Sequence, residues 1–138
     1  MPSVWYPPNT SGSVSTNVAK GAFGITIDGG GSAISDGEKG YISIPYNGTI
    51  SKWRLMADQA GNITIDLWKD TYGNFPPTSG DSITGTDTPT LSSQQSAEST
   101  ALTGWTTSVQ AGDVVAFNVS GAATLTRVTL IIELNKST

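Results

Sequence analysis

The feature that most constrains this chain is the alternation of apolar and polar side chains in short runs separated by turn residues. Successive side chains of a β-strand point to opposite faces, so such runs predict strands with one buried face. No apolar pattern with the 3.6-residue helical period is present, and the sequence therefore predicts an all-β fold. Three of the predicted inward rows are Phe23, Ile25 and Ile27; Val115, Phe117 and Val119; and Val128, Leu130, Ile132 and Leu134.

Two hairpins in series are predicted between Tyr41 and Trp68. Asn47-Gly48 suits the tight turn of a first hairpin, and residues 58–62 supply the turn of a second. Symmetry of the second hairpin about Ala60 sorts the side chains onto two faces. The inward face contains Ile42, Trp53, Leu55, Ala57, Ile63, Ile65 and Leu67. The outward face contains Tyr41, Lys52, Arg54, Asp66 and Trp68.

This outward face is the predicted contact surface. The hairpin register places Lys52 opposite Trp68, which permits a cation–π contact. It also places Arg54 between Tyr41 and Asp66. The face is either an ordinary solvated sheet surface or an interface for a second copy or a ligand, because Trp, Tyr and Arg are enriched in interface cores.

The loop after Trp68 carries two more aromatic residues, Tyr72 and Phe75, and ends in Pro76-Pro77. Two alternatives are open for these side chains. They either fold back to close one end of the sandwich core or form a surface that stacks on a sugar or contacts a subunit.

Residues 1–21 form a predicted extended arm, which contains three prolines and a polar run from Asn9 to Asn17. Val4, Trp5 and Tyr6 are the residues expected to attach this arm to a neighbouring subunit or partner, since adjacent aromatic residues are costly to leave in water. The alternative is a frayed terminus. No signal peptide is expected from this beginning of the chain.

Composition excludes several classes of function. The chain has no cysteine and no histidine, which removes disulfides, thiolate metal sites and the commonest general base. Charged residues make up 13% of the chain and the net charge is −4, so no nucleic-acid surface is expected. No stretch is long and apolar enough to predict a membrane span. We therefore expect no enzyme activity, no catalytic residues and no cofactor.

The loop around Gly29-Gly30-Gly31 is flanked by Asp28, Asp36 and Glu38. Oxygen ligands from such loops suit calcium, but the spacing is not that of an EF-hand. A plain turn between two strands is the expected structure, and a calcium site is the alternative.

Several short motifs carry a resemblance. They are ITIDGGGSAI at 25–34, PYNGTISKW at 45–53, ADQ at 57–59, DLWKDTY at 66–72, NFPP at 74–77, LTGWTT at 102–107, AGD at 111–113 and TRVTL at 126–130. Together these motifs resemble a domain of tailed-bacteriophage and prophage virion proteins over about residues 23–135. That domain often forms the C-terminal part of longer tail or tail-fibre-like proteins. The resemblance implies a structural role in the phage particle and brings no catalytic motif.

The expected fold is a single antiparallel β-sandwich of about eight strands, jelly-roll-like, over residues 22–138 behind the arm. The expected function is that of a virion structural protein, tail-fibre-like or capsid-decorating, assembled in the host cytoplasm. Its expected partners are further copies of itself, with a trimer as the expected form, other virion proteins and a host surface glycan. The alternative function is a carbohydrate-binding module or receptor-binding adhesin.

Overall fold

The computed structural model describes residues 19–137, and these residues form strands almost throughout. The elements in chain order are β1 (Lys20–Asp28), β2 (Gly37–Ser43), β3 (Gly48–Thr71), the short 3-10 helices η1 (Tyr72–Asn74) and η2 (Ser79–Asp81), β4 (Thr90–Ser99), β5 (Ser108–Val109), β6 (Asp113–Ala123) and β7 (Arg127–Lys136). Among the described residues no helix is long and apolar enough to cross a membrane. The predicted all-β, antiparallel fold is confirmed.

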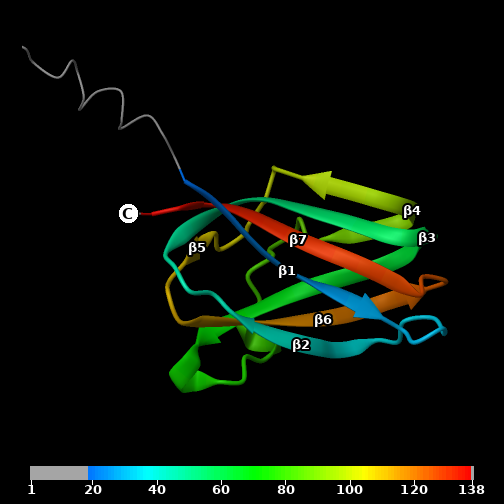
Figure 1. Ribbon diagram of the computed structural model, residues 1–138, viewed down its shortest axis with the longest axis horizontal. Helices are drawn as coiled ribbons and strands as arrows, with labels where there is room; N and C mark the ends of the chain where they lie inside the picture. Colours follow the sequence, from blue (N-terminus) through cyan, green and yellow to red (C-terminus); the bar gives the residue numbers. More distant parts are fainter. Residues whose placement is uncertain (1–18, 138) are drawn as a thin grey trace, which may run out of the picture.

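The strands form one antiparallel sheet that curls until its two halves face each other across the core (Figure 1). Hydrogen bonds connect the strands in the order β1-β7-β3-β6-β2, and β4 and β5 pair with β3 as well. We call β1, β7 and residues 48–57 of β3 the first layer, and β2, β6 and residues 61–71 of β3 the second layer. β4 pairs with both halves of β3 and so belongs to both layers.

Strand β3 doubles back at its middle, and its two halves lie in different layers (Figure 1). The predicted second hairpin is therefore wrong in its pairing. Residues 48–57 pair with β7 instead of with residues 61–71, which pair with β6. One strand replaces two predicted ones, which is why seven strands are described where about eight were expected.

At Asn47-Gly48 the chain crosses from the second layer to the first, so these residues do not form the predicted first hairpin. β2 pairs with β6 in the second layer, whereas β3 begins beside β7 in the first. A side chain at Gly48 would approach the carbonyl oxygen of Asn135 to 2.7 Å. Glycine is required here by the close approach of β7, and Asn47 accepts a hydrogen bond from the Ala111 amide at 2.8 Å.

The core lies between the layers and is built from the predicted inward rows. Those of β6 and β7 are almost entirely excluded from solvent. In β3, Trp53, Leu55, Ile63, Ile65 and Leu67 are buried as predicted, facing inward from both halves of the strand. Phe23, Ile25 and Ile42, on the two edge strands, are only partly buried. The alternation therefore predicted correctly which of these side chains face the core, although the predicted pairing of the strands was wrong.

Between η2 and β6 the sequence predicts short strands near 88–92 and 99–102, a strand over 104–109 and a turn at 111–113, and only part of this is present. The strand expected near Thr88–Ser92 forms part of β4, but the one expected near Ser99–Leu102 is absent, since β4 ends at Ser99. The strand predicted from Gly104 is reduced to the two residues of β5. The turn at Ala111-Gly112-Asp113 is present, with Gly112 at a φ of +93°.

Asp58 ties the bend of β3 to the connection between β6 and β7. Its carboxylate accepts hydrogen bonds from the Thr126 amide and hydroxyl and from the Arg127 amide. Gln59 adds a bond from its side-chain amide to the Thr124 carbonyl at 3.0 Å. The hydrogen bond from the Thr126 side chain is the main cause that lowers the pKa of Asp58 to about 2.

This lowered pKa predicts a loss of stability in acid. The ordinary value for Asp58 is 3.8, so its contribution to folding is fully present above about pH 4 and is lost as the pH falls through about 2. Urea midpoints measured between pH 5 and pH 2 should fall less steeply below pH 4 in Asp58→Asn than in the parent chain. Equal slopes in the two proteins would contradict the assignment.

Candidate functional site

An aromatic cluster lies on the outer surface of the second layer. Tyr41 of β2 is opposite Ala116 of β6, and Ala116 is opposite Trp68 of β3. Opposed residues of an antiparallel sheet point to the same face, so Tyr41 and Trp68 share one surface. Tyr41 is 45% exposed, and its predicted outward orientation is confirmed.

The loop after β3 brings Tyr72 and Phe75 to this surface. The rings of Phe75 and Tyr41 meet edge to face, with centroids 4.7 Å apart. Tyr72 is 75% exposed and Phe75 is 46% exposed. Neither residue belongs to the core cluster, so the alternative in which they close one end of the core is wrong.

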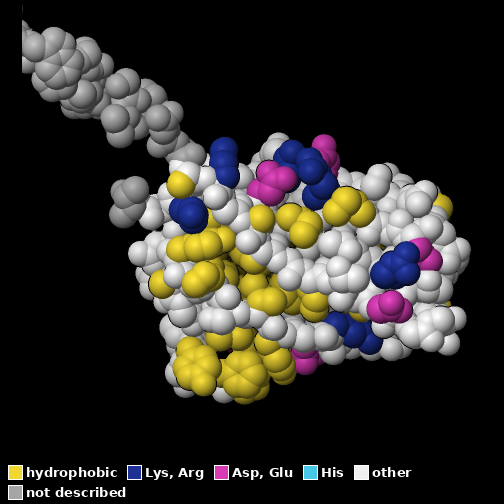
Figure 2. Space-filling model, viewed as in Figure 1, with side chains coloured by type: hydrophobic (Ala, Val, Ile, Leu, Met, Phe, Trp, Pro, Cys, Tyr) yellow, Lys and Arg dark blue, Asp and Glu magenta, His cyan; other side chains and the backbone are white. Residues whose placement is uncertain are grey.

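These rings border a hollow beside the edge strand β2. Its volume is about 390 Å³, and Ile42, Ser43 and Val114 complete its lining. Figure 2 shows hydrophobic side chains gathered at this place, at the lower left of the molecule. We call Tyr41, Trp68, Tyr72 and Phe75 the aromatic surface.

Polar groups at the edge of the aromatic surface are engaged by their neighbours. Glu38 raises the pKa of Tyr41, chiefly by hydrogen bonding to its side chain. Trp68 donates its indole N–H to Asp66 at 3.0 Å. The other oxygen of Asp66 accepts the hydroxyls of Ser82 at 2.7 Å and of Thr84 at 2.6 Å. Asp66 therefore anchors the segment after η2 and fixes Trp68.

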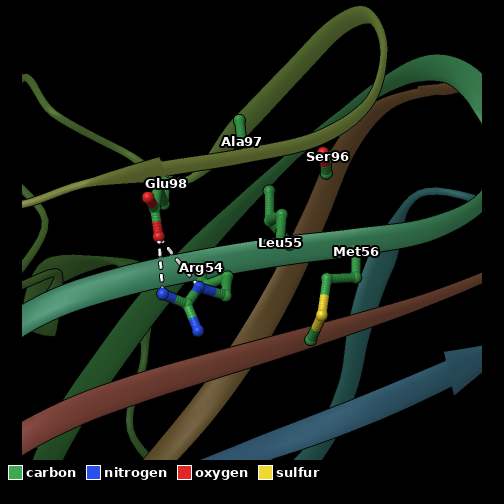
Figure 3. Close-up of a pocket in the computed structure, with 6 residues that line it drawn as sticks. All are labelled: Arg54, Leu55, Met56, Ser96, Ala97 and Glu98. Carbon is green, nitrogen blue, oxygen red and sulfur yellow. Dashed lines mark hydrogen bonds and ion pairs between the residues drawn. The ribbon is translucent and has the colours of Figure 1, made fainter.

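Lys52 and Arg54 lie on the outer face of the other layer. Arg54 is opposite Ile131 of β7 and Glu98 of β4, and its Nη2 lies 2.7 Å from the Glu98 carboxylate (Figure 3). The Lys52 ammonium contacts the same carboxylate at 3.4 Å. The predicted Lys52–Trp68 contact and the predicted place of Arg54 between Tyr41 and Asp66 are both wrong, because β3 carries its halves to opposite sides of the core.

Glu98 completes an ion-pair group that the sequence did not reveal. Hydrogen bonds from Arg54 lower the pKa of Glu98, and Glu98 raises the pKa of Arg54 in return. The hollow beside this pair has a volume of about 280 Å³ and is lined by residues 54–56 and 96–98 (Figure 3). The Glu98 carboxylate beside this hollow is held by both Arg54 and Lys52.

Two carboxylates around the glycine-rich loop accept hydrogen bonds from different backbone amides. Asp28 accepts the Gly30 amide at 2.7 Å, and Asp36 accepts the Ala122 amide at 3.1 Å. Gly30 and Gly31 have φ values of +70° and +91°, which fits the expected turn. Within residues 19–137, no group of three acidic side chains is arranged to hold a metal ion.

The predicted attachment residues Val4, Trp5 and Tyr6 lie outside the described residues. The other predicted contact residues separate into two groups. Tyr41, Asp66, Trp68, Tyr72 and Phe75 lie on the second layer, and Lys52 and Arg54 lie on the first.

Comparison of the chain with protein-family models, with curated proteins and with solved structures finds no match. The resemblance to phage virion proteins therefore remains a prediction.

Proposed function

We propose that this chain is a non-enzymatic structural protein of a bacteriophage particle that works by contact, with its aromatic surface as the contact region. The contact role rests on the exposure of Tyr41, Tyr72 and Phe75 together at one edge of the sheet, and the phage particle rests on the sequence motifs that resemble virion proteins. Clustered exposed rings are typical of surfaces that bind a partner. The partners in this proposal are further copies of the chain, with a trimer as the expected form, and other proteins of the particle.

The attachment role of the arm remains part of the proposal. The first described residue, Ala19, accepts a hydrogen bond from the amide of Lys136 of β7. Val4, Trp5 and Tyr6 would then bind a neighbouring protein of the particle. Immunogold labelling of particles and electron microscopy would test both the virion role and its location in head or tail; unlabelled particles would contradict it.

Replacing Tyr72 and Phe75 with serine should remove contact without unfolding the chain. Both side chains are exposed, so the double variant should lose about 1 kcal/mol or less of unfolding free energy. Mass by light scattering and incorporation into particles should both fall. Met56→Ser is a matched control, since Met56 is 42% exposed on the first layer. Unchanged assembly in the double variant would argue against the aromatic surface.

Carbohydrate binding is the second candidate, because aromatic rings border a hollow that also contains the Ser43 side chain. Aromatic faces stack on sugar rings through their apolar side, and polar neighbours fix the orientation. A glycan array would distinguish the two candidates. Binding that is lost in Trp68→Ala, Tyr72→Ala and Phe75→Ala would favour a sugar ligand over a protein contact.

A further inference from the structure

Within residues 19–137, β1 is an edge strand whose own sequence carries little of the usual protection against pairing. Its sequence from Gly21 to Ile27 contains no charge and no proline, and its pairing with β7 runs without a bulge. Edge strands of monomeric proteins are normally protected by charges, proline or bulges. The other edge strand, β2, has such protection, because it contains Glu38 and Lys39 and a register shift before Tyr41.

The free edge of β1 can be assigned residue by residue. Ala19 and Gly29 form backbone hydrogen bonds toward β7 and its preceding turn, which places the odd-numbered residues on the paired side. The amides and carbonyls of Ala22, Gly24 and Thr26 therefore point to the free side. Among the described residues, Tyr46 donates its hydroxyl to the Ala22 carbonyl at 3.1 Å, which confirms this direction. A carbonyl oxygen has two lone pairs, so Ala22 can still accept a second bond.

An apolar band follows this free edge. Figure 2 shows hydrophobic side chains exposed between β1 and β2, where the two layers meet at the open side of the curled sheet. Phe23, Ile25, Ile42 and Tyr46 are among the partly buried residues there. A strand added to β1 in the first layer would cover this band.

We propose that β1 pairs with β1 of a second copy, antiparallel and centred on Gly24, so that the first layers of two chains form one continuous sheet. This contact rests on the proposed self-assembly and adds to it, because a twofold contact would join two of the expected trimers. Three independent features of β1 agree with this one register. The first is hydrogen bonding, because centring on Gly24 places Ala22 opposite Thr26 of the second copy. The Ala22 amide and both backbone groups of Thr26 point to the unpaired side, and the Ala22 carbonyl, which accepts Tyr46, has a second lone pair.

The second feature is charge. Lys20 and Asp28 are the two charged residues of β1 and stand at its two ends, equally far from Gly24. In this register each Lys20 lies opposite Asp28 of the second copy, which gives two opposite-charge pairs per dimer. A shift of the register would lose both pairs.

The third feature is the apolar row. Phe23 of each copy lies opposite Ile25 of the other, on the inner side, in the closely spaced pairs that have no hydrogen bonds. Aromatic and β-branched residues form favourable cross-strand pairs of this kind. The side chains that are half exposed in one chain would then cover each other.

The absence of cysteine makes a direct test possible. Ala22→Cys and Thr26→Cys in one chain should form a covalent dimer with oxidised glutathione, because opposed Cα atoms in a hydrogen-bonded pair are about 5.5 Å apart. Both positions are exposed in the single chain. Each single variant should stay monomeric under denaturing conditions, since its thiol has no opposed thiol in this register.

The outcomes separate this contact from self-assembly in general. A parent chain that is monomeric, with no disulfide in the double variant, would overturn both. An oligomer whose double variant forms no disulfide would overturn only the β1 contact. An oligomer of only three chains would do the same, because a twofold contact requires an even number of chains. A monomer whose introduced thiols are alkylated slowly would show that another segment of the same chain covers the edge, which would also overturn it.

A charge change gives a second measurement that does not depend on cysteine. Lys20→Glu places like charges opposite each other at both ends of the contact and should weaken the dimer by about tenfold. Lys39→Glu makes the same change of charge on β2 and should leave the dissociation constant unchanged. Equal effects of the two variants would contradict the proposed register.

Discussion

Replacing Phe117 with alanine should lower the free energy of unfolding by about 3 to 5 kcal/mol. Phe117 is the largest of the fully buried side chains and lies in the middle of β6, opposite Leu67 of β3. Its removal takes apolar area out of the core and leaves a cavity that the two surrounding layers cannot close completely. Urea unfolding followed by tryptophan fluorescence would measure the loss.

Phe75→Ala is the matched control for this measurement. It deletes the same atoms from a side chain that is 46% exposed, so the expected loss is about 1 kcal/mol or less. Similar losses in the two variants would contradict the assignment of Phe117 to the core and of Phe75 to the surface.

Asp113→Ala should destabilise the fold by about 2 to 4 kcal/mol. Asp113 is buried at the start of β6. Its carboxylate accepts hydrogen bonds from the Lys69 ammonium at 3.2 Å and from the Gln110 backbone amide at 2.8 Å. The Lys69 side chain is only 16% exposed, so removal of the carboxylate leaves a positive charge with little access to water. It also leaves the Gln110 amide without its acceptor.

A double-mutant cycle with Lys69→Met separates these two costs. The double variant should be more stable than Asp113→Ala alone, because it no longer contains an uncompensated charge. The remaining loss would report the hydrogen bond to Gln110. Strictly additive effects of the two changes would show that the ion pair does not contribute.

Alternation along each run was enough to predict which side chains face the core. Leu55 and Ile65 illustrate the reason, since the period of two depends only on local strand geometry and holds whichever strand lies alongside. The partners of those strands were not predictable from the same pattern. Residues 58–62 reverse the chain, as predicted, but they carry it into the opposite layer, and local turn residues do not distinguish these two outcomes.

The aromatic surface was predicted in part for a similar reason. Tyr41 was predicted to face outward, whereas a core position and an exposed position were both open for Tyr72 and Phe75. All three side chains are exposed, and Phe75 lies against Tyr41. Arg54 was assigned to Asp66, whereas it pairs with Glu98, 44 residues away in the sequence. The partner of an exposed charge depends on which strands are neighbours, and one sequence does not supply that information.

The doubled-back course of β3 has a consequence for how the chain folds. Because β3 and β4 each belong to both layers, neither layer can form a complete sheet while the other is unfolded. Unfolding should therefore occur in a single cooperative transition with no half-folded species. The partners of β3 include β6 and β7 from the far end of the chain, so the loops that must close are long and refolding should be slow, in the range of milliseconds to seconds.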